Sequence, residues 1–125
     1  MKRIISTPNA PAAIGPYSQA VEANNTLYLS GQIPINPATG TIVEGGIIEQ
    51  THQVLRNIQA ILDAAGYAVS DVVKSTVYLA DMQYFAEVNA IYKTFYTTDF
   101  PARSAFAVKG LPLGALVEIE TIAAK

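Results

Sequence analysis

The stretch ALVEIETIAA, residues 115–124, decides which fold class the sequence predicts. Its apolar and polar residues alternate, as they do in a strand that buries one face of a sheet. One face would carry Val117, Ile119 and Thr121, and the other would carry Glu118, Glu120 and Ile122. The first set suits a core packed under helices. The second set places two carboxylates on the opposite face of the sheet.

The segments that precede this strand predict several more strands. RSAFAVK (103–109) leads into the turn GLPLG (110–114), so we expect a hairpin with residues 115–124. VVKSTVYLA (72–80) is rich in β-branched and aromatic residues, which favour strands. SQAVEANNTLYLSG (18–31) predicts two strands joined at Asn24-Asn25, because asparagine tolerates the positive φ of a tight turn. IPINPATGTIV (33–43) predicts a turn-rich excursion instead.

Two further segments have the periodicity of helices. The first is followed by Gly66, a residue typical of a helix end. Its apolar positions recur at spacings of three and four, namely Ile48, Thr51, Leu55, Ile58, Leu62 and Ala65. Asp81 is suited to cap the second helix. That helix has the apolar stripe Phe85, Val88, Tyr92 and Phe95.

These elements predict one α+β domain over residues 1–125, with a sheet and two helices packed on one face of it. Two helices leave the second face of the sheet uncovered. Hydrophobic residues make up 50% of the chain and charged residues only 14%, which is little charge for the surface of a small monomer. We therefore expect the uncovered face to meet another subunit.

Composition also excludes several classes of function. The net charge of −2 predicts no binding of nucleic acid or anionic lipid. There is no cysteine, and His52 is the only histidine, so we expect no transition-metal site and place His52 at the surface. No apolar run approaches the roughly 20 residues of a membrane helix, and the amino-terminal residues do not look like a secretory signal. The expected location is the cytoplasm.

Arg103, at the start of an apolar run, has two interpretations. If the final hairpin aligns Ala105 with Glu118, then Arg103 faces Glu120 on the same side of the sheet, with Phe106 and Val108 on the core side. A cross-strand ion pair would then need no function. That ion pair leaves Glu118 without a cation. Alternatively, the guanidinium holds the carboxylate of a ligand with two parallel hydrogen bonds.

Four stretches together resemble the RidA (YjgF) family of imine and enamine deaminases. They are APAAIGPYSQAV (10–21), LYLSGQIPINPATG (27–40), FAEVNAIYKTFY (85–96) and PARSAFAVKGLPLGALVEI (101–119). They cover almost the whole chain in the order that the family has. The resemblance implies a chorismate-mutase-like fold in a homotrimer, with sites in the clefts between subunits and no cofactor.

The resemblance also implies a role for each matching residue. Arg103 would hold the substrate carboxylate, and Glu118 would activate the attacking water with help from the backbone carbonyl of Ala105. The remaining pocket residues would be Tyr17, Ser30, Gly31 and Asn89. Arg103 and Glu118 must then share one wall of a cavity between protomers, where the nearby arginine would keep Glu118 ionised. Many family members have cysteine where this chain has Ala105, so thiol chemistry is not expected.

The predicted function is hydrolysis of 2-imino or 2-enamino acids, such as 2-aminoacrylate or 2-iminobutanoate, to 2-keto acids and ammonia. Orientation and general base catalysis would suffice for an imine, which already hydrolyses in water. Two alternatives stay open. The trimer could bind small keto or amino acids without turnover. Less in keeping with the charge balance, it could be an endoribonuclease or translation inhibitor, which would need a basic surface.

Overall fold

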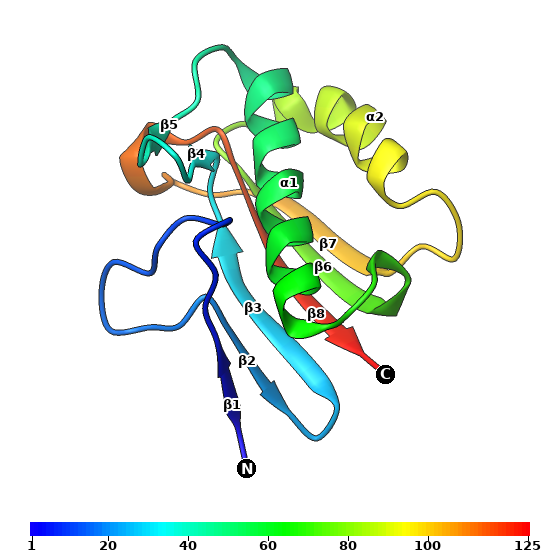
Figure 1. The fold of residues 1–125 in the computed structure, drawn as a ribbon. Coiled ribbons are helices and arrows are strands. Elements are labelled where there is room, and N and C mark those ends of the chain that lie inside the picture. Colours follow the sequence, from blue (N-terminus) through cyan, green and yellow to red (C-terminus); the bar gives the residue numbers. More distant parts are fainter.

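The computed structural model describes residues 1–125 as one six-stranded sheet, a separate two-stranded ribbon and two helices. The strands are β1 (Arg3–Ile5), β2 (Ala20–Ala23), β3 (Thr26–Gln32), β4 (Ile35–Asn36), β5 (Thr41–Ile42), β6 (Val72–Leu79), β7 (Ala102–Ala107) and β8 (Val117–Ala124). The helices are α1 (Ile47–Ala65) and α2 (Phe85–Phe95). Both helices cover the same face of the sheet (Figure 1), which confirms the predicted α+β class and the placement of the helices.

The strand order in the sheet is β1-β2-β3-β8-β6-β7, so the strand at residues 115–124 lies inside the sheet and not at its edge. All neighbouring strands are antiparallel except β6 and β7, which are parallel. The expected hairpin between β7 and β8 is therefore wrong. The chain returns from β6 through α2 before it enters β7, which lets β7 join the free edge of β6 in the parallel direction.

The register decides which side chains share a face. Arg103 is aligned with Ser75, and Ser75 is aligned with Thr121, so all three lie on the side of the sheet that the helices cover. Glu118 is aligned with Tyr78 on the uncovered face. The expected pairing of Arg103 with Glu120 on one face is wrong, because β6 separates β7 from β8.

Phe106 also lies on the uncovered face and not in the core as expected. It is aligned with Tyr78, and the two rings meet edge to face with centroids 5.4 Å apart. Phe106 is 45% exposed, and Ile4 and Tyr28 on the same face are 53% and 49% exposed. This face is thus apolar in places and has no helix over it, as the sequence predicts.

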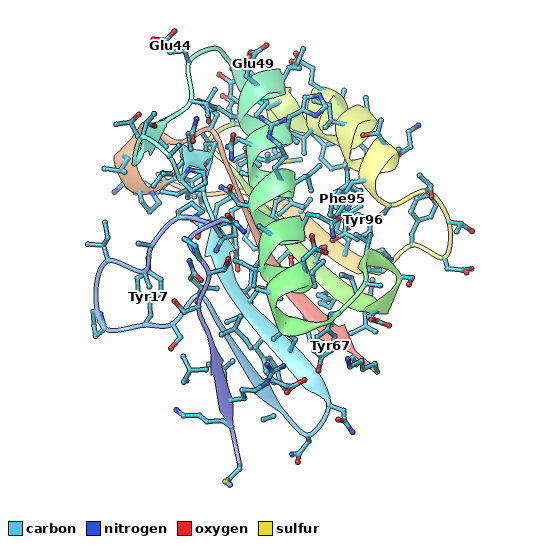
Figure 2. The ribbon with its side chains drawn as sticks, in the orientation of Figure 1. Tyr17, Glu44, Glu49, Tyr67, Phe95 and Tyr96 are labelled. Atoms are coloured by element: carbon cyan, nitrogen blue, oxygen red, sulfur yellow. The ribbon has the colours of Figure 1, made fainter.

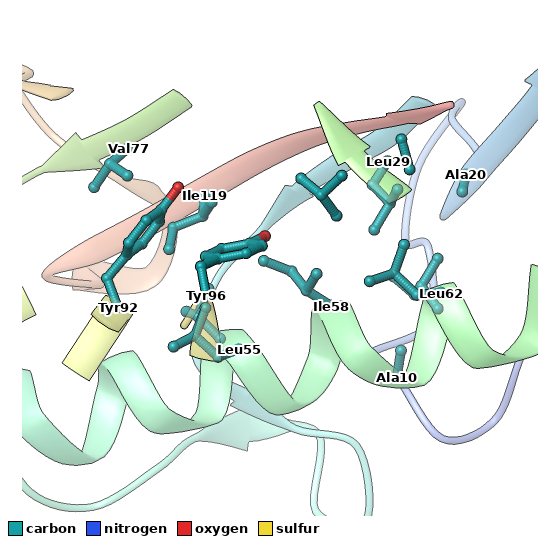
Figure 3. Packing of buried hydrophobic residues seen from close by; sticks show 14 of the residues in the cluster. Ala10, Ala20, Leu29, Leu55, Ile58, Leu62, Val77, Tyr92, Tyr96 and Ile119 are labelled. Atoms are coloured by element: carbon teal, nitrogen blue, oxygen red, sulfur yellow. The ribbon is translucent and has the colours of Figure 1, made fainter. Parts of the chain in front are cut away.

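α1 packs its apolar stripe on the centre of the sheet (Figure 3). Leu55, Ile58 and Leu62 are buried as predicted, but Ile47 takes the first core position and Ile48 is 45% exposed. Gly66 ends the helix at φ 81°, in the left-handed region that favours glycine. Burial of each such aliphatic side chain contributes about 1.5–3 kcal/mol, so this stripe is a main source of stability.

The local turn predictions have mixed outcomes. Asn24 and Asn25 have φ of 52° and 57°, as expected for the tight turn between β2 and β3. Asp81 caps a 3₁₀ turn, Met82–Tyr84, and α2 follows directly at Phe85. The excursion at residues 33–43 contains the short ribbon of β4 and β5, which the sequence analysis did not predict. Neither helix is long and apolar enough to cross a membrane.

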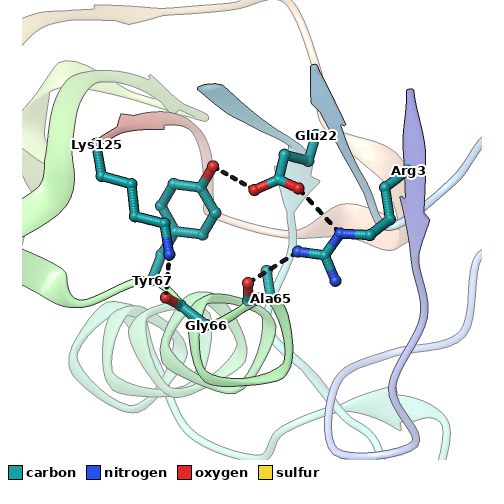
Figure 4. Close-up of polar contacts among 6 residues, drawn as sticks. All are labelled: Arg3, Glu22, Ala65, Gly66, Tyr67 and Lys125. Carbon is teal, nitrogen blue, oxygen red and sulfur yellow. Dashed lines mark hydrogen bonds and ion pairs between the residues drawn. The ribbon is translucent and has the colours of Figure 1, made fainter. Parts of the chain in front are cut away.

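β1, which the sequence analysis also missed, is joined to the end of α1 by a polar network (Figure 4). Arg3 pairs with Glu22 at 2.9 Å and donates to the Ala65 carbonyl. The Tyr67 hydroxyl donates to Glu22, while Lys125 caps the Gly66 carbonyl. Burial, and then the hydrogen bond to Glu22, raises the pKa of Tyr67 to about 12. The network joins both ends of the chain to α1.

A buried amide on α1 holds the segment that follows β3. The Asn57 side chain is 1% exposed and donates to the carbonyls of Ile33 and Ile35 at 3.2 Å and 3.0 Å. Its own Oδ1 accepts from Gln53 at 2.8 Å. We expect Asn57→Ala to lower the free energy of unfolding by about 3 kcal/mol, because two partly buried carbonyls lose their donor. Urea denaturation measures the change. The control is Gln59→Ala, a half-exposed amide on the same helix, and an equal loss there would contradict the prediction.

Candidate active site

Gly31 and Glu118 meet at an irregularity between β3 and β8. The register advances three residues on β3, from Leu29 to Gln32, but only two on β8, so Ser30 and Gly31 form a β-bulge. A Cβ at Gly31 would overlap the Glu118 Oε2 and lie 3.0 Å from its Cδ. Only glycine leaves room for this carboxylate. Gly31 thus lies both in a β-bulge and at a close approach to the Glu118 carboxylate.

The Glu118 carboxylate forms no hydrogen bond or ion pair within the chain, whose single salt bridge joins Arg3 and Glu22. Burial raises the pKa of Glu118, and the charge of Glu120 raises it further. The expectation that a nearby arginine favours the ionised form is wrong for a single chain, because Arg103 lies on the other face of the sheet. A carboxyl with a raised pKa is a stronger base when it is ionised.

Two residues next to Glu118 and Gly31, namely Glu120 and Ser30, also form hydrogen bonds. Glu120 accepts a hydrogen bond from the Tyr78 hydroxyl at 3.1 Å. The Ser30 hydroxyl donates to the Ser18 carbonyl at 2.6 Å, and the Ser30 N–H donates to the Gln19 carbonyl. Ser30 therefore fixes the path of the chain next to Gly31.

Arg103 is half-buried on the helix side of β7. Its Nη1 donates to Asn89 Oδ1 at 2.8 Å. Its guanidinium carbon lies 4.8 Å from the centroid of the Tyr92 ring and 5.5 Å from that of Phe85. These groups orient the arginine through a hydrogen bond and cation–π contacts. They are all neutral, so the guanidinium keeps its charge free for an anion.

A cavity of about 320 Å³ opens beside this arginine. Its walls are formed by Asn89, Tyr92, Lys93, Phe100, Pro101 and Arg103. Two of these side chains are cationic and none is acidic. A cavity of this size suits a small molecule, and its charges suit a carboxylate.

The backbone of Ala105 faces the free edge of the sheet. Val108 N–H donates to the Leu79 carbonyl at 2.9 Å, so the backbone N–H and C=O of Val108 point toward β6. Successive residues of a strand point their backbone groups in opposite directions. The carbonyls of Arg103, Ala105 and Ala107 therefore point away from β6, toward an edge that has no neighbouring strand.

Tyr17 does not line the cavity beside Arg103. It belongs to the loop between β1 and β2, where it is 54% exposed (Figure 2). It lines a different cavity, of about 670 Å³, together with loop residues such as Pro8, Ala13 and Ser18. Within one chain Tyr17 forms no hydrogen bond with Arg103 or Glu118, although Ser18 beside it accepts a hydrogen bond from Ser30.

Apart from Tyr17, the predicted site residues thus fall into two half-sites. The carboxylate half-site is Ser30, Gly31 and Glu118, and the arginine half-site is Asn89, Arg103 and Ala105. Arg103 and Glu118 lie on opposite faces of the sheet, so the prediction that one chain places them on a shared wall is wrong.

Several contacts of the arginine half-site were not predicted. Tyr92 and Phe85 were assigned only to the apolar stripe of the second helix, and they also form the surface on which Arg103 rests. Lys93 and Phe100 line the cavity. Aromatic residues on one helix face give no sequence signal that separates packing from a cation–π contact.

The raised pKa of Glu118 has a consequence for stability. Because its pKa is higher in the folded chain, the folded state holds more protons, and stability falls as pH rises from the ordinary carboxyl pKa toward the raised one. We expect Glu118→Gln to raise the melting temperature at about pH 7 and to lose that advantage below about pH 4. Thermal unfolding at the two pH values measures this. Glu44→Gln, on an exposed loop residue (Figure 2), is the control. A Glu118→Gln melting temperature below wild type at pH 7 would contradict the prediction.

Comparisons with known proteins agree on one family. The sequence profile of the Endoribonuclease L-PSP family matches residues 7–125. The chain is 52% identical to the 2-iminobutanoate/2-iminopropanoate deaminase of Mus musculus over 98% of this chain and 91% of that protein. It superposes on a Yersinia pestis structure of the conserved Rid protein family with a TM-score of 0.98, at 52% identity and with both chains fully covered.

A third similar structure is that of Escherichia coli TdcF with bound serine. Its TM-score is 0.94, the identity is 41%, and 98% of each chain is covered. With the profile, the sequence identities and the fold in agreement, the chain belongs to the RidA (YjgF) family.

Proposed function

We propose that this protein hydrolyses 2-imino acids, and their 2-enamine tautomers, to 2-keto acids and ammonia. The observation that carries the proposal is Arg103, a half-buried cation without an ion pair beside a small cavity that has no acidic wall. Such an arginine is suited to the carboxylate of an imino acid. The mouse relative is named for this activity, and the TdcF structure contains serine, a small amino acid with the same carboxylate.

The complete site combines the arginine half-site of one protomer with the carboxylate half-site of its neighbour. The two half-sites lie on opposite faces of the sheet, so no single chain can assemble them. A cyclic trimer joins two different patches of the same chain at every interface. The free edge of β7 and the partly apolar uncovered face are two such patches. This arrangement supports the homotrimer that the family resemblance implies.

The chemistry follows from the two half-sites. Arg103 binds the carboxylate and places the imine carbon at the edge of β7. Glu118 of the neighbour and the Ala105 carbonyl hold a water molecule, and Glu118 takes its proton as the oxygen bonds to that carbon. The imine reacts in its protonated form, so transfer of this proton to the nitrogen of the adduct gives an ammonium group. Glu118 then takes the proton of the new hydroxyl group, the C–N bond breaks, and ammonia leaves as the C=O bond forms. General base catalysis of this kind contributes about 10²–10⁴-fold.

Capture of keto or amino acids without turnover is the alternative that uses the same arginine. It differs in the role of Glu118. If Glu118→Ala leaves both ligand binding and the rate of ammonia release unchanged, the protein binds and does not catalyse.

Complementation between protomers tests the shared site. We expect Arg103→Ala and Glu118→Ala to be inactive alone, and trimers that contain both variants to recover activity, because some interfaces then carry an intact Arg103 opposite an intact Glu118. With random mixing, roughly a quarter of the sites are complete. Ammonia release from an imine generated in the assay measures the recovery.

The matched control mixes Arg103→Ala with a double variant that carries both Arg103→Ala and Glu118→Ala. Every protomer in this mixture lacks Arg103, so no interface is complete. Sizing should show Arg103→Ala as a folded trimer. Arg103→Lys should also have low turnover, because an ammonium cannot form two parallel hydrogen bonds with a carboxylate. Recovery no greater than that of the control would contradict a site shared between protomers.

Gly31→Ala tests the placement of Glu118. The added methyl group would displace the carboxylate, which is the end of a flexible side chain, so the fold should persist. We expect turnover to fall on the order of 10²-fold, the usual effect of a misplaced catalytic group. Gly110→Ala is the control, since a Cβ there meets open space. Wild-type turnover in Gly31→Ala would remove Glu118 from the mechanism.

A further inference from the structure

Four buried hydroxyl groups between α2 and the sheet form a group that we name the hydroxyl cluster: Ser75, Tyr92, Tyr96 and Thr121. Their side chains are 0%, 3%, 3% and 1% exposed. None of the four hydroxyls has a hydrogen-bond partner within the chain. The proposed reaction uses none of them.

The four hydroxyls come from two layers of the fold and face one another. Ser75 and Thr121 are aligned on β6 and β8 and point toward the helices. Tyr92 and Tyr96 come from the end of α2, with ring centroids 4.7 Å apart, and their rings extend between helix and sheet (Figure 3). Burial raises the pKa of both phenols. Ser75 opposes this rise at Tyr92, and Ser75 and Thr121 oppose it at Tyr96, so these hydroxyls lie close to hydrogen-bonding distance of one another.

A buried hydroxyl without a partner destabilises a fold, so such groups normally bond to protein or to ordered water. An internal water typically makes about three hydrogen bonds with groups of this kind. Two cavities adjoin the cluster. Tyr92 forms part of the wall of the Arg103 cavity, and Tyr96 forms part of the wall of a second cavity, of about 300 Å³, near Thr97 and Asp99.

The hydroxyl cluster also lies directly behind the arginine half-site. Arg103 is aligned with Ser75 on the neighbouring strand. The Tyr92 ring supports the guanidinium at 4.8 Å, while its hydroxyl belongs to the cluster. Whatever holds the Tyr92 hydroxyl therefore also sets the position of the ring under Arg103.

We propose that the hydroxyl cluster is an internal site for ordered water, and that the hydrated cluster positions Arg103 through Tyr92. The second half of this inference rests on the proposed role of Arg103 in binding the substrate carboxylate. The first half is independent of it. Tyr92, Tyr96, Ser75 and Thr121 are thus positioning residues and do not contact the substrate.

The water site is tested by a high-resolution crystal structure and by Thr121→Val, which replaces the hydroxyl with a methyl group of similar size. We expect an ordered water within about 3.2 Å of at least three of the four hydroxyl oxygens. We also expect Thr121→Val to lower the melting temperature, because the water loses a partner. If the hydroxyls are unpaired and dry, the same change removes a destabilising group and raises the melting temperature. Failure of either expectation overturns the water site.

The positioning role is tested by the kinetics of Tyr92→Phe, which keeps the ring and removes the hydroxyl. We expect KM to rise severalfold with little change in kcat, because carboxylate binding weakens while Glu118 is untouched. Tyr67→Phe is the matched control: this tyrosine is also 3% exposed, but its hydroxyl donates to Glu22, away from Arg103. It should lower stability and leave KM unchanged.

An unchanged KM in Tyr92→Phe, or an equal rise in Tyr67→Phe, overturns the positioning role. Failure of the proposed function has a different signature, which is wild-type turnover in Arg103→Ala. That result would leave the outcome of the crystal structure and of Thr121→Val unaffected.

Discussion

Side chains along a strand alternate between the two faces of its sheet, and this constraint, transmitted across β6, determines where the candidate site residues lie. β6 separates β7 from β8 and is parallel to one and antiparallel to the other. The register turns Arg103 toward the helices and Glu118 toward the uncovered face. Two groups that the proposed chemistry needs together are thus held apart by the thickness of the sheet. The proposed assembly is the way in which one rigid sheet can supply both.

Arg3 on β1 and Arg103 on β7 lie on the two edge strands of the sheet, and their neighbours determine whether the charge is paired within the chain. Arg3 pairs with Glu22, and its guanidinium also bonds to the end of α1 (Figure 4), so its charge is used within the chain. That pairing lowers the pKa of Glu22. Arg103 has an amide and two aromatic rings as neighbours instead. They orient its charge without neutralising it, which is the condition for binding an anion.

Buried polar side chains connect the stability of the core to the carboxylate half-site. Asn57 on α1 holds the carbonyls that follow Gly31, and Gln50 on the same helix accepts a hydrogen bond from the Leu116 N–H at 2.8 Å. The segments before Glu118 and after Gly31 are therefore attached to one helix. In the apolar centre of the domain these amides are satisfied, whereas the hydroxyls near Arg103 have no partner within the chain.

The sequence by itself determined the elements whose signals are local. Apolar periodicity located both helices, alternation located β8 and its two faces, and Asn24-Asn25 located a turn. The family motifs singled out Arg103, Glu118, Gly31 and Asn89, and membership of the family is confirmed. Only the tertiary structure decided strand order, because pairing of β7 with β6 or with β8 depends on contacts distant in sequence. The pairing of β7 with β6 places Arg103 on the face that the helices cover, opposite to Glu118. Likewise, the contacts of Tyr92 with Arg103 and with the buried hydroxyls exist only once α2 packs on the sheet, since a helical period reports which side chains are buried and not what they meet there.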